Sequence, residues 1–541
     1  MSPSLFIHSV TRFSSTVSNF SSTVSPSLLD HVYCKLRNAA QIAGIAIFDV
    51  SDHLPIFLLL STSINRKAER QIIRCMKNFN LENFLIDLEE ALSPWNFNTG
   101  STVHNDFDEF IHIFQTIINK HAPFRKSSRR EKQLQAKPWK TRGLLTSIKN
   151  KNRMFRKCHK CKDAKLIVQY KKYTNKLRRL RKIAKQQHYF KLFQKYRSNS
   201  KKTWKTINES YSTHQKQSSD INSLKLNDGT RTSCPITISN TLNEYFSSTG
   251  VSMGNGIRPT NTSFTTFTKT ISKSFVLDGP CAEEVVACIN NLRNTSSRGI
   301  DGISTKFLKL AKSAIAPILA KLFNKSMECG EHPDCLKISQ IVPIPKCSSP
   351  SIPSHYRPIS ILPTVPKIFE KILYARLSNF LNKNTLLTNL QYGFRNNASI
   401  KLTVSAIYQI FLENMDKGKS TWAVFLDLSK AFDTVDHKIL LSKLMYYGIR
   451  GKQNSFFESY VTNRKQCTKV NNYSSNFQTI ACGVPRVSVM GPLLFLIYVN
   501  DLPCASGFQT TLFADDTSMH LSHKDIKTLQ LTVMFKMSLI K

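Results

Sequence analysis

Two short apolar runs near the end of the chain predict strands that carry acidic residues. Residues 422–426 form an unbroken apolar run of the kind that gives a strand buried on both faces, and the run ends at Asp427. A second run, residues 511–513, leads into Asp515 and Asp516, and further apolar residues follow. Carboxylates placed between two such runs are typical of the tip of a β-hairpin. We therefore expect three acidic side chains at the ends of strands.

Apolar residues spaced by three and four positions predict helices over much of the remaining chain. The expected helices lie within residues 65–119, 144–193, 238–246, 282–292, 366–380 and 436–447. The last of them should stop at Gly448, since glycine favours the conformation that ends a helix. A short strand is expected at residues 341–346, and further strands at residues 28–33 and 44–60.

The charge is extreme and concentrated in one block. The 541 residues include 76 Lys or Arg against 35 Asp or Glu, a net charge of +41. Residues 125–205 hold 30 Lys or Arg and two acids, 30 − 2 = +28, and their pattern predicts long basic helices with one apolar stripe. Such a one-sided field favours a polyanion, namely RNA or DNA, on which the interleaved aromatic rings can stack. The alternative is that these aromatics form core and the charges a solvated face.

Burying three carboxylates beside one another costs several kcal/mol unless cations lie between them. Magnesium takes oxygen ligands, and two such ions about 4 Å apart stabilise the attacking and leaving oxygens of a phosphoryl displacement. That is the chemistry of nucleotide addition. The alternative is that Asp427 caps the turn after its strand and that Asp515 and Asp516 are solvated turn residues.

Five motifs, in this order and spacing, resemble those of reverse transcriptases of the jockey-like non-LTR retrotransposon type. They are HYRPISIL at 355–362, QYGFR at 391–395, FLDLSKAFD at 425–433, GVPRVSVMGPLLFLIYVNDL at 483–502 and FADD at 513–516. The resemblance implies RNA-directed DNA polymerase activity that adds dNTP to a DNA primer on an RNA template, with two Mg²⁺ or Mn²⁺ ions. It implies that Asp427 and Asp515 hold both ions and that Asp516 supports them.

The resemblance also implies roles for residues around the carboxylates. Lys346 and Arg357 would bind the triphosphate; the alternative for Arg357 is a structural ion pair. Phe432 would block a ribose 2′-hydroxyl, or it is a core residue, and Gly483 belongs to the nucleotide pocket. The segment that lies along the template would contribute Gln391, Gly393 and Arg395.

The nucleotide loop departs from the family pattern Gly-Val-Pro-Gln-Gly-Ser. The chain has Arg486 and Val487 in place of the Gln and the second Gly, and a β-branched side chain has less backbone freedom than glycine. We expect Val487 to crowd the nucleotide and to reduce polymerisation. The chain ends about 25 residues after Asp516, which predicts that a thumb is missing and that the element is partial.

Residues 1–60 resemble the last strands of an apurinic-type endonuclease, with Asp30, Asp52 and His53 at the matching places. His53 beside Asp52 suits a base and the carboxylate that orients it. The upstream metal and phosphate ligands of that family are missing, so an inactive remnant is expected and an endonuclease is excluded.

We predict an α+β protein in five parts: the nuclease remnant of sandwich type (1–60), a helical linker (61–124), a basic helical region (125–210), a flexible connector (211–280), and the fingers and palm of a right-hand polymerase around an antiparallel sheet (281–541). Scattered cysteines without a disulfide framework indicate an intracellular protein of the nucleus or cytoplasm, with no membrane partner. The rival function is a catalytically dead nucleic-acid-binding remnant. The sequence leaves the oligomeric state open.

Overall fold

The computed structural model describes most of the chain in two units. The described residues are 6–10, 30–34, 41–45, 56–60, 72–93, 101–128, 131, 137–161, 163–211, 221–226, 228–256, 263–268, 270–293, 299–347 and 349–539. One unit comprises residues 1–74 and 124–216, and the other comprises residues 75–123 and 217–541. Each unit is described by itself.

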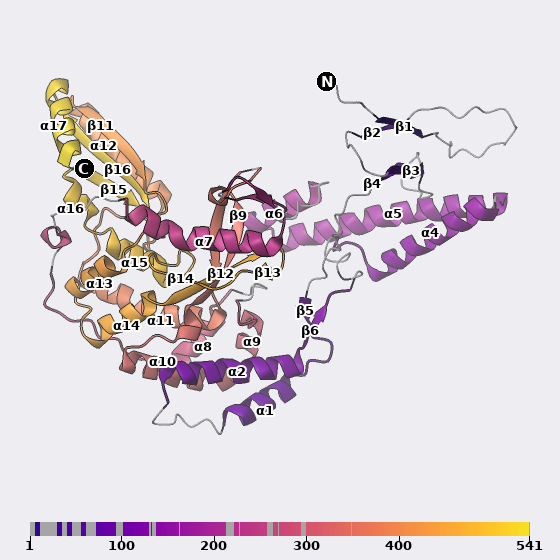
Figure 1. The fold of residues 1–541 in the computed structure, drawn as a ribbon, viewed down its shortest axis with the longest axis horizontal. Coiled ribbons are helices and arrows are strands. Elements are labelled where there is room, and N and C mark those ends of the chain that lie inside the picture. The colour runs from indigo at the N-terminus through magenta and orange to yellow at the C-terminus, as the bar shows by residue number, and fades with distance from the viewer. Residues whose placement is uncertain are drawn as a thin grey trace. The chain divides into compact units, whose positions relative to one another are not determined.

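The first unit contains short paired strands and long basic helices (Figure 1). Its described elements are β1 (Phe6–Val10), β2 (Asp30–Cys34), β3 (Gln41–Ile45), β4 (Ile56–Leu60), β5 (Ile72–Arg74), β6 (Phe124–Lys126), α4 (Arg142–Cys161), α5 (Ala164–Lys195) and α6 (Ser200–Tyr211). The pairs β1–β2, β3–β4 and β5–β6 are antiparallel. Asp30 begins β2, whereas Asp52 and His53 lie outside the described residues, so the nuclease remnant stays a prediction.

The long basic helices that the sequence predicted are present as α4 and α5, which pack on each other. The Tyr173 hydroxyl of α5 donates a hydrogen bond to the Ser147 carbonyl of α4 over 3.3 Å. Leu177 is buried, but Phe190 and Trp204 are 63% and 64% exposed. Some of the apolar stripe is therefore core, and some aromatic rings remain available to a ligand.

The second unit combines a helical core with two sheets. Its helices are α1 (Leu81–Leu92), α2 (Val103–His121), α7 (Pro235–Gly254), α8 (Ala282–Asn290), α9 (Thr305–Leu310), α10 (Lys312–Cys329), α11 (Thr364–Lys383), α12 (Ile400–Asp416), α13 (His437–Tyr446), α14 (Lys452–Val461), α15 (Met490–Tyr498), α16 (Leu502–Ser506) and α17 (Ile526–Leu539). Its strands are β7 (Leu224–Lys225), β8 (Arg231–Thr232), β9 (Ile338–Pro345), β10 (Tyr356–Ile361), β11 (Ser420–Asp427), β12 (Arg464–Val470), β13 (Tyr473–Ser474), β14 (Gln478–Ile480), β15 (Gln509–Phe513) and β16 (Asp516–His523).

Stacked aromatic rings hold the helical core together. Phe323 of α10 stacks on Phe369 of α11 with ring centroids 4.2 Å apart, and Phe107 of α2 stacks on Phe323 from the other side. Phe84 of α1 is also fully buried in this core. Residues 75–123, which we expected to be a helical linker, therefore belong to the core of this unit, because α1 and α2 each present a row of large apolar side chains to it.

A three-stranded antiparallel sheet in the order β11-β16-β15 carries the acidic residues (Figure 1). The prediction that residues 422–426 form a strand is confirmed, but the expectation that both of its faces are buried is wrong. Phe425 and Leu426 are 68% and 39% exposed. The reason is that β11 is an edge strand of an antiparallel sheet and not a central strand of a parallel one.

Helix α7 packs on a second sheet, in which β12 pairs with β9, β13 and β14, and β9 also pairs with β10 (Figure 1). The amide nitrogen of Asn243 in α7 donates hydrogen bonds to the carbonyls of Gln466 and Asn476. Ile238 and Leu242 are fully buried. The sequence predicted a helix here within a flexible connector; the described helix is longer and is fixed to the sheet.

The burial of Asp301, which lies beside the helical core, can be tested. Burial raises the pKa of its carboxyl from 3.8 to about 6, while Oδ1 accepts a hydrogen bond from the Ile303 amide and Oδ2 has no partner. The folded chain therefore keeps a proton that the unfolded chain has already lost, and the free energy of unfolding falls as pH rises between the two pKa values.

We predict that Asp301→Asn, which does not titrate, gains stability relative to the wild type by about 3 kcal/mol between about pH 4 and pH 7, an order-of-magnitude figure. Denaturant unfolding of both proteins across this pH range measures the difference. Parallel stability curves would contradict the assigned pKa.

Candidate functional site

The backbone register brings the three predicted carboxylates to one end of the β11-β16-β15 sheet. Asp427, the last residue of β11, lies opposite Asp516, the first residue of β16. Ala514 and Asp515 form the two-residue turn between β15 and β16, and Ala514 adopts a φ of 58°. The predicted hairpin tip is thus confirmed. Asp515 lies in the turn, directly before the Asp516 that pairs with Asp427.

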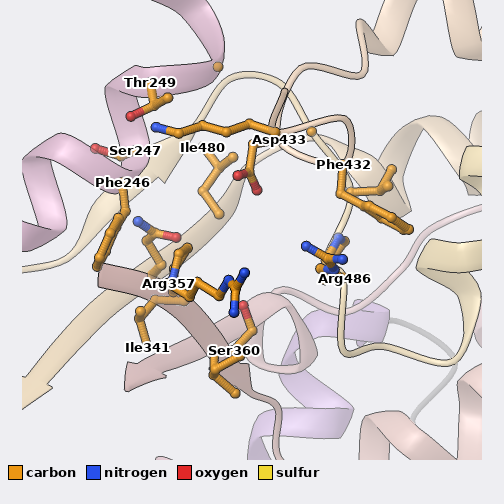
Figure 2. Close-up of a pocket in the computed structure, with 18 of the residues that line it drawn as sticks. Phe246, Ser247, Thr249, Ile341, Arg357, Ser360, Phe432, Asp433, Ile480 and Arg486 are labelled. Atoms are coloured by element: carbon orange, nitrogen blue, oxygen red, sulfur yellow. The ribbon is translucent and has the colours of Figure 1, made fainter. Parts of the chain in front are cut away.

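These carboxylates border a cavity of about 710 Å³ in the second unit. The cavity is also lined by the predicted nucleotide residues Lys346, Arg357, Phe432 and Gly483. Figure 2 shows Arg357 in the cavity with Asp433 and Arg486 beside it. A volume of this size suits a small-molecule ligand. Residues as far apart in the chain as Tyr245 and Asp516 therefore meet at one cavity.

The electrostatics of the cavity favour cations near the hairpin. Burial and the neighbouring carboxylates of Asp515 and Asp427 raise the pKa of Asp516. Burial raises the pKa of Asp433, and the positive charges of Lys430 and Arg486 oppose this rise. Because like charges are held together by backbone pairing, a bound cation would relieve their repulsion.

Lys346 and Arg357 line the same cavity from the β9-β10 hairpin. The Lys346 ammonium donates a hydrogen bond to the Ser354 carbonyl over 2.9 Å. No ion pair joins Arg357 to a carboxylate among the residues that the structure describes, so the alternative of a structural ion pair is not what we find. Both cations therefore remain available to an anionic ligand.

Gly483 seats the next loop against the chain that follows Asp427. Its φ is 90°, and a Cβ there would lie 2.9 Å from the Asp433 carbonyl oxygen. The Val484 amide donates to the Phe432 carbonyl, and the Gly483 carbonyl lies 2.8 Å from the His437 ring nitrogen Nε2. Gly483 thus positions this loop through close backbone packing.

The departure in this loop acts through Arg486. A guanidinium nitrogen of Arg486 lies 3.7 Å from a carboxylate oxygen of Asp515, and the guanidinium also lies over the Phe432 ring. Val487 is 49% exposed and is not among the residues that line the cavity. The expectation that Val487 crowds the nucleotide is therefore wrong, since its side chain points to solvent.

Phe432 is a core residue in this structure. It is 2% exposed and stacks on Phe495 with centroids 4.5 Å apart, and Phe394 meets its edge. Only a small part of Phe432 reaches the cavity. Of the two alternatives from the sequence, core packing accounts for its position.

Two of the predicted template residues contact the turn formed by Ala514 and Asp515. The Gln391 side-chain oxygen accepts hydrogen bonds from the Gly393 amide over 2.7 Å and from the Ala514 amide over 2.9 Å. Gln391 is 5% exposed, and Arg395 donates to the Thr388 carbonyl. Gln391 and Gly393 are thus positioning residues for the turn that carries Asp515. They do not form an open template surface here.

Helix α7 forms a wall of the cavity that sequence reasoning did not assign. Tyr245, Phe246 and Gly250 line the cavity, and the Lys430 ammonium donates to the Tyr245 hydroxyl over 3.0 Å. Figure 2 shows Phe246 of α7 on the same side of the cavity as Arg357. The adjacent aromatics in a polar segment were the available signal, but nothing in the sequence tied them to Lys430.

Two absences concern the described part of the chain. There, no group of three or more His, Cys, Asp or Glu side chains is arranged to hold a metal ion. The carboxylates border the cavity without forming a closed coordination cluster, and the Arg486 guanidinium neighbours Asp515 where a cation would bind. In addition, none of the helices in the described residues combines the length and apolar character that a bilayer crossing requires.

The comparisons with known proteins agree with this site. Residues 344–538 match the family described as reverse transcriptase (RNA-dependent DNA polymerase). The matched region contains all three carboxylates, the Lys346 and Arg357 pair and the Gly483 loop. Residues 344–538 are therefore a region of reverse transcriptase type.

The relatives narrow the family further. The chain is 32% identical over 233 residues to the probable RNA-directed DNA polymerase from transposon BS of Drosophila melanogaster, which covers 42% of this chain and 25% of that protein. It is 28% identical over 262 residues to the RNA-directed DNA polymerase from mobile element jockey of the same organism, covering 47% of this chain and 28% of that protein. The chain thus spans about a quarter of the length of these curated relatives. Its reverse transcriptase region is jockey-like.

The contact between Gly393 and the hairpin turn gives a testable prediction. An added Cβ at residue 393 would lie 2.1 Å from the Ala514 amide nitrogen, and backbone cannot yield as a flexible side chain can. We expect Gly393→Ala to lower the free energy of unfolding by about 1–3 kcal/mol. Gly254→Ala is the control, because nothing lies within 4 Å of its added Cβ. Equal denaturation midpoints for the two variants would refute the contact.

Proposed function

We propose that this chain is an RNA-directed DNA polymerase of a non-LTR retrotransposon, which adds dNTP to the 3′-hydroxyl of a DNA primer on an RNA template. The observation that carries the proposal is the register of β11 against β16, which sets Asp427 opposite Asp516 with Asp515 in the adjoining turn. The reverse transcriptase match over residues 344–538 supports the same chemistry. In this proposal the domain supplies the fingers and palm of a right-hand polymerase.

Asp427 and Asp515 would hold two Mg²⁺ or Mn²⁺ ions, and Asp516 would support them. Bound ions of this kind activate the attacking oxygen and stabilise the leaving one. The donor set fits, since hard divalent cations prefer carboxylate oxygens and the repulsion at Asp516 calls for positive charge. The chain's own carboxylates orient the reacting phosphate, while Gln391 and Gly393 keep the turn of Asp515 in place.

Lys346 and Arg357 would bind the triphosphate from the β9-β10 hairpin. Arg357 offers a planar fork for two phosphate oxygens, and Lys346 offers a point charge. Both line the same cavity as the carboxylates. In this proposal the two cations bind the tail of a nucleotide, and the carboxylates bind the ions at its reacting phosphate. We place the activity inside the cell, in the nucleus or cytoplasm, because its template and primer are found there.

Primer extension tests the proposal directly. We expect Mg²⁺-dependent incorporation of dTTP on a poly(rA)–oligo(dT) substrate to fall at least about 100-fold in Asp515→Asn, since the amide holds a divalent ion weakly. Asp416→Asn is the control, because Asp416 is exposed at the end of α12. Equal incorporation by both variants would rule out the assigned role of Asp515.

Arg486 generates a second prediction. Because its guanidinium pairs with Asp515, it competes with a divalent ion for that carboxylate. We expect Arg486→Gln to lower the Mg²⁺ concentration that gives half-maximal incorporation by several-fold. Val487→Gly should leave it unchanged, since Val487 does not line the cavity. If Val487→Gly alone increased incorporation, the hypothesis that Val487 crowds the nucleotide would be restored.

A nucleic-acid-binding protein without catalysis is the second candidate. The net charge of +28 over residues 125–205 and the exposed rings of Phe190 and Trp204 favour it. Salt-sensitive RNA binding by the full chain, with no incorporation under any divalent ion, would support this candidate over the polymerase.

A further inference from the structure

Two buried polar side chains on β12 lie at the same cavity without partners for all of their donors. Arg464 and Gln466 are 3% and 5% exposed, and both line the cavity. The guanidinium nitrogen Nη2 of Arg464 and the amide nitrogen Nε2 of Gln466 have no hydrogen-bond partner. Such donors cost free energy when they are buried and unpaired. The proposed roles of the carboxylates, Lys346 and Arg357 leave both donors unexplained.

The strand geometry places these two side chains together. Residues two apart on a strand share a face, so Arg464, Gln466 and Thr468 project to the same side of β12. The Thr468 hydroxyl donates to the Asn243 side-chain oxygen of α7. That face is therefore the one beneath α7, whose residues Tyr245 to Gly250 border the cavity.

Cations slightly outnumber acids around this cavity, and the charge of Arg464 also opposes the rise that burial causes in the pKa of the Glu370 carboxyl. Five cationic and four acidic side chains line the cavity, and Arg486 is already paired with an acid. Arg464 is held by the Tyr460 carbonyl through Nη1 and by the Tyr460 ring, but it forms no ion pair with a carboxylate of the described residues. Arg357 is on β10 of the same sheet and lines the same cavity. A guanidinium with one nitrogen fixed and another free, beside an amide donor, suits phosphate oxygens.

We propose that Arg464 and Gln466 form a phosphate-binding subsite in this cavity, on the face of β12 beneath α7. This assignment rests on the proposed function, because that function brings a phosphate-bearing ligand into the cavity. The phosphate belongs either to the tail of a nucleotide and the pyrophosphate released from it, or to the backbone of a bound strand. Both sources present the same oxyanion to the two donors.

The test compares Gln466→Met with Gln478→Met in the full chain. Gln478 is the exposed register partner of Gln466 on β14 and does not line the cavity, so it is a matched control. Titrations measure the binding of inorganic pyrophosphate and, separately, of an octanucleotide RNA. We expect Gln466→Met to weaken one of the two by about tenfold, since a buried donor to a charged group is lost. The ligand that is weakened identifies the source of the phosphate.

Stability supplies a second readout that a structural role would not give. Gln466→Met removes an unpartnered buried donor, so the ligand-free variant should be at least as stable as the wild type while it binds phosphate less well. Arg464→Lys, which keeps the charge and loses the fork, should weaken the same ligand. Unchanged binding of both ligands in both variants, or no binding of either by the wild type, would overturn the subsite. A wild type that binds phosphate but never polymerises would defeat the proposed function and leave the subsite standing.

Discussion

Backbone hydrogen bonds between β11 and β16 hold Asp427 and Asp516 against each other, although their charges repel. Contacts with the rest of the fold offset this repulsion. Gln391 and Gly393 fix the turn beside these strands, and Arg486 already lies near Asp515 as a counter-charge. Folding energy is thus used to keep like charges at one cavity, which is typical of functional sites.

The cavity is assembled from elements that are distant in the chain. Its walls come from the β9-β10 hairpin, from α7 and β12, and from the two loops that carry Gly483 and Asp433. The contact between α7 and β12 joins residues 223 positions apart. Carboxylates and cations both line this cavity, and a nucleotide with a divalent ion carries complementary charges of both signs.

The carboxylates could be predicted from the sequence because each depends on a local pattern: a strand that ends at Asp427, and a hairpin tip at Asp515. The exposure of Phe425 was missed because an apolar run does not distinguish a central strand from an edge strand. The support of Ala514 by Gln391 and the wall formed by α7 were missed because both are long-range contacts. The two-residue departure in the Gly483 loop was visible, but only packing shows which of its side chains reaches the cavity.

Anomalous diffraction from crystals of the chain grown with Mn²⁺ and a nucleotide tests the central claim most directly. The account predicts manganese peaks bridged by the Asp427 and Asp515 carboxylates, with Arg486 displaced from Asp515. Manganese bound only elsewhere, with Asp427 and Asp515 still free of metal, would contradict it.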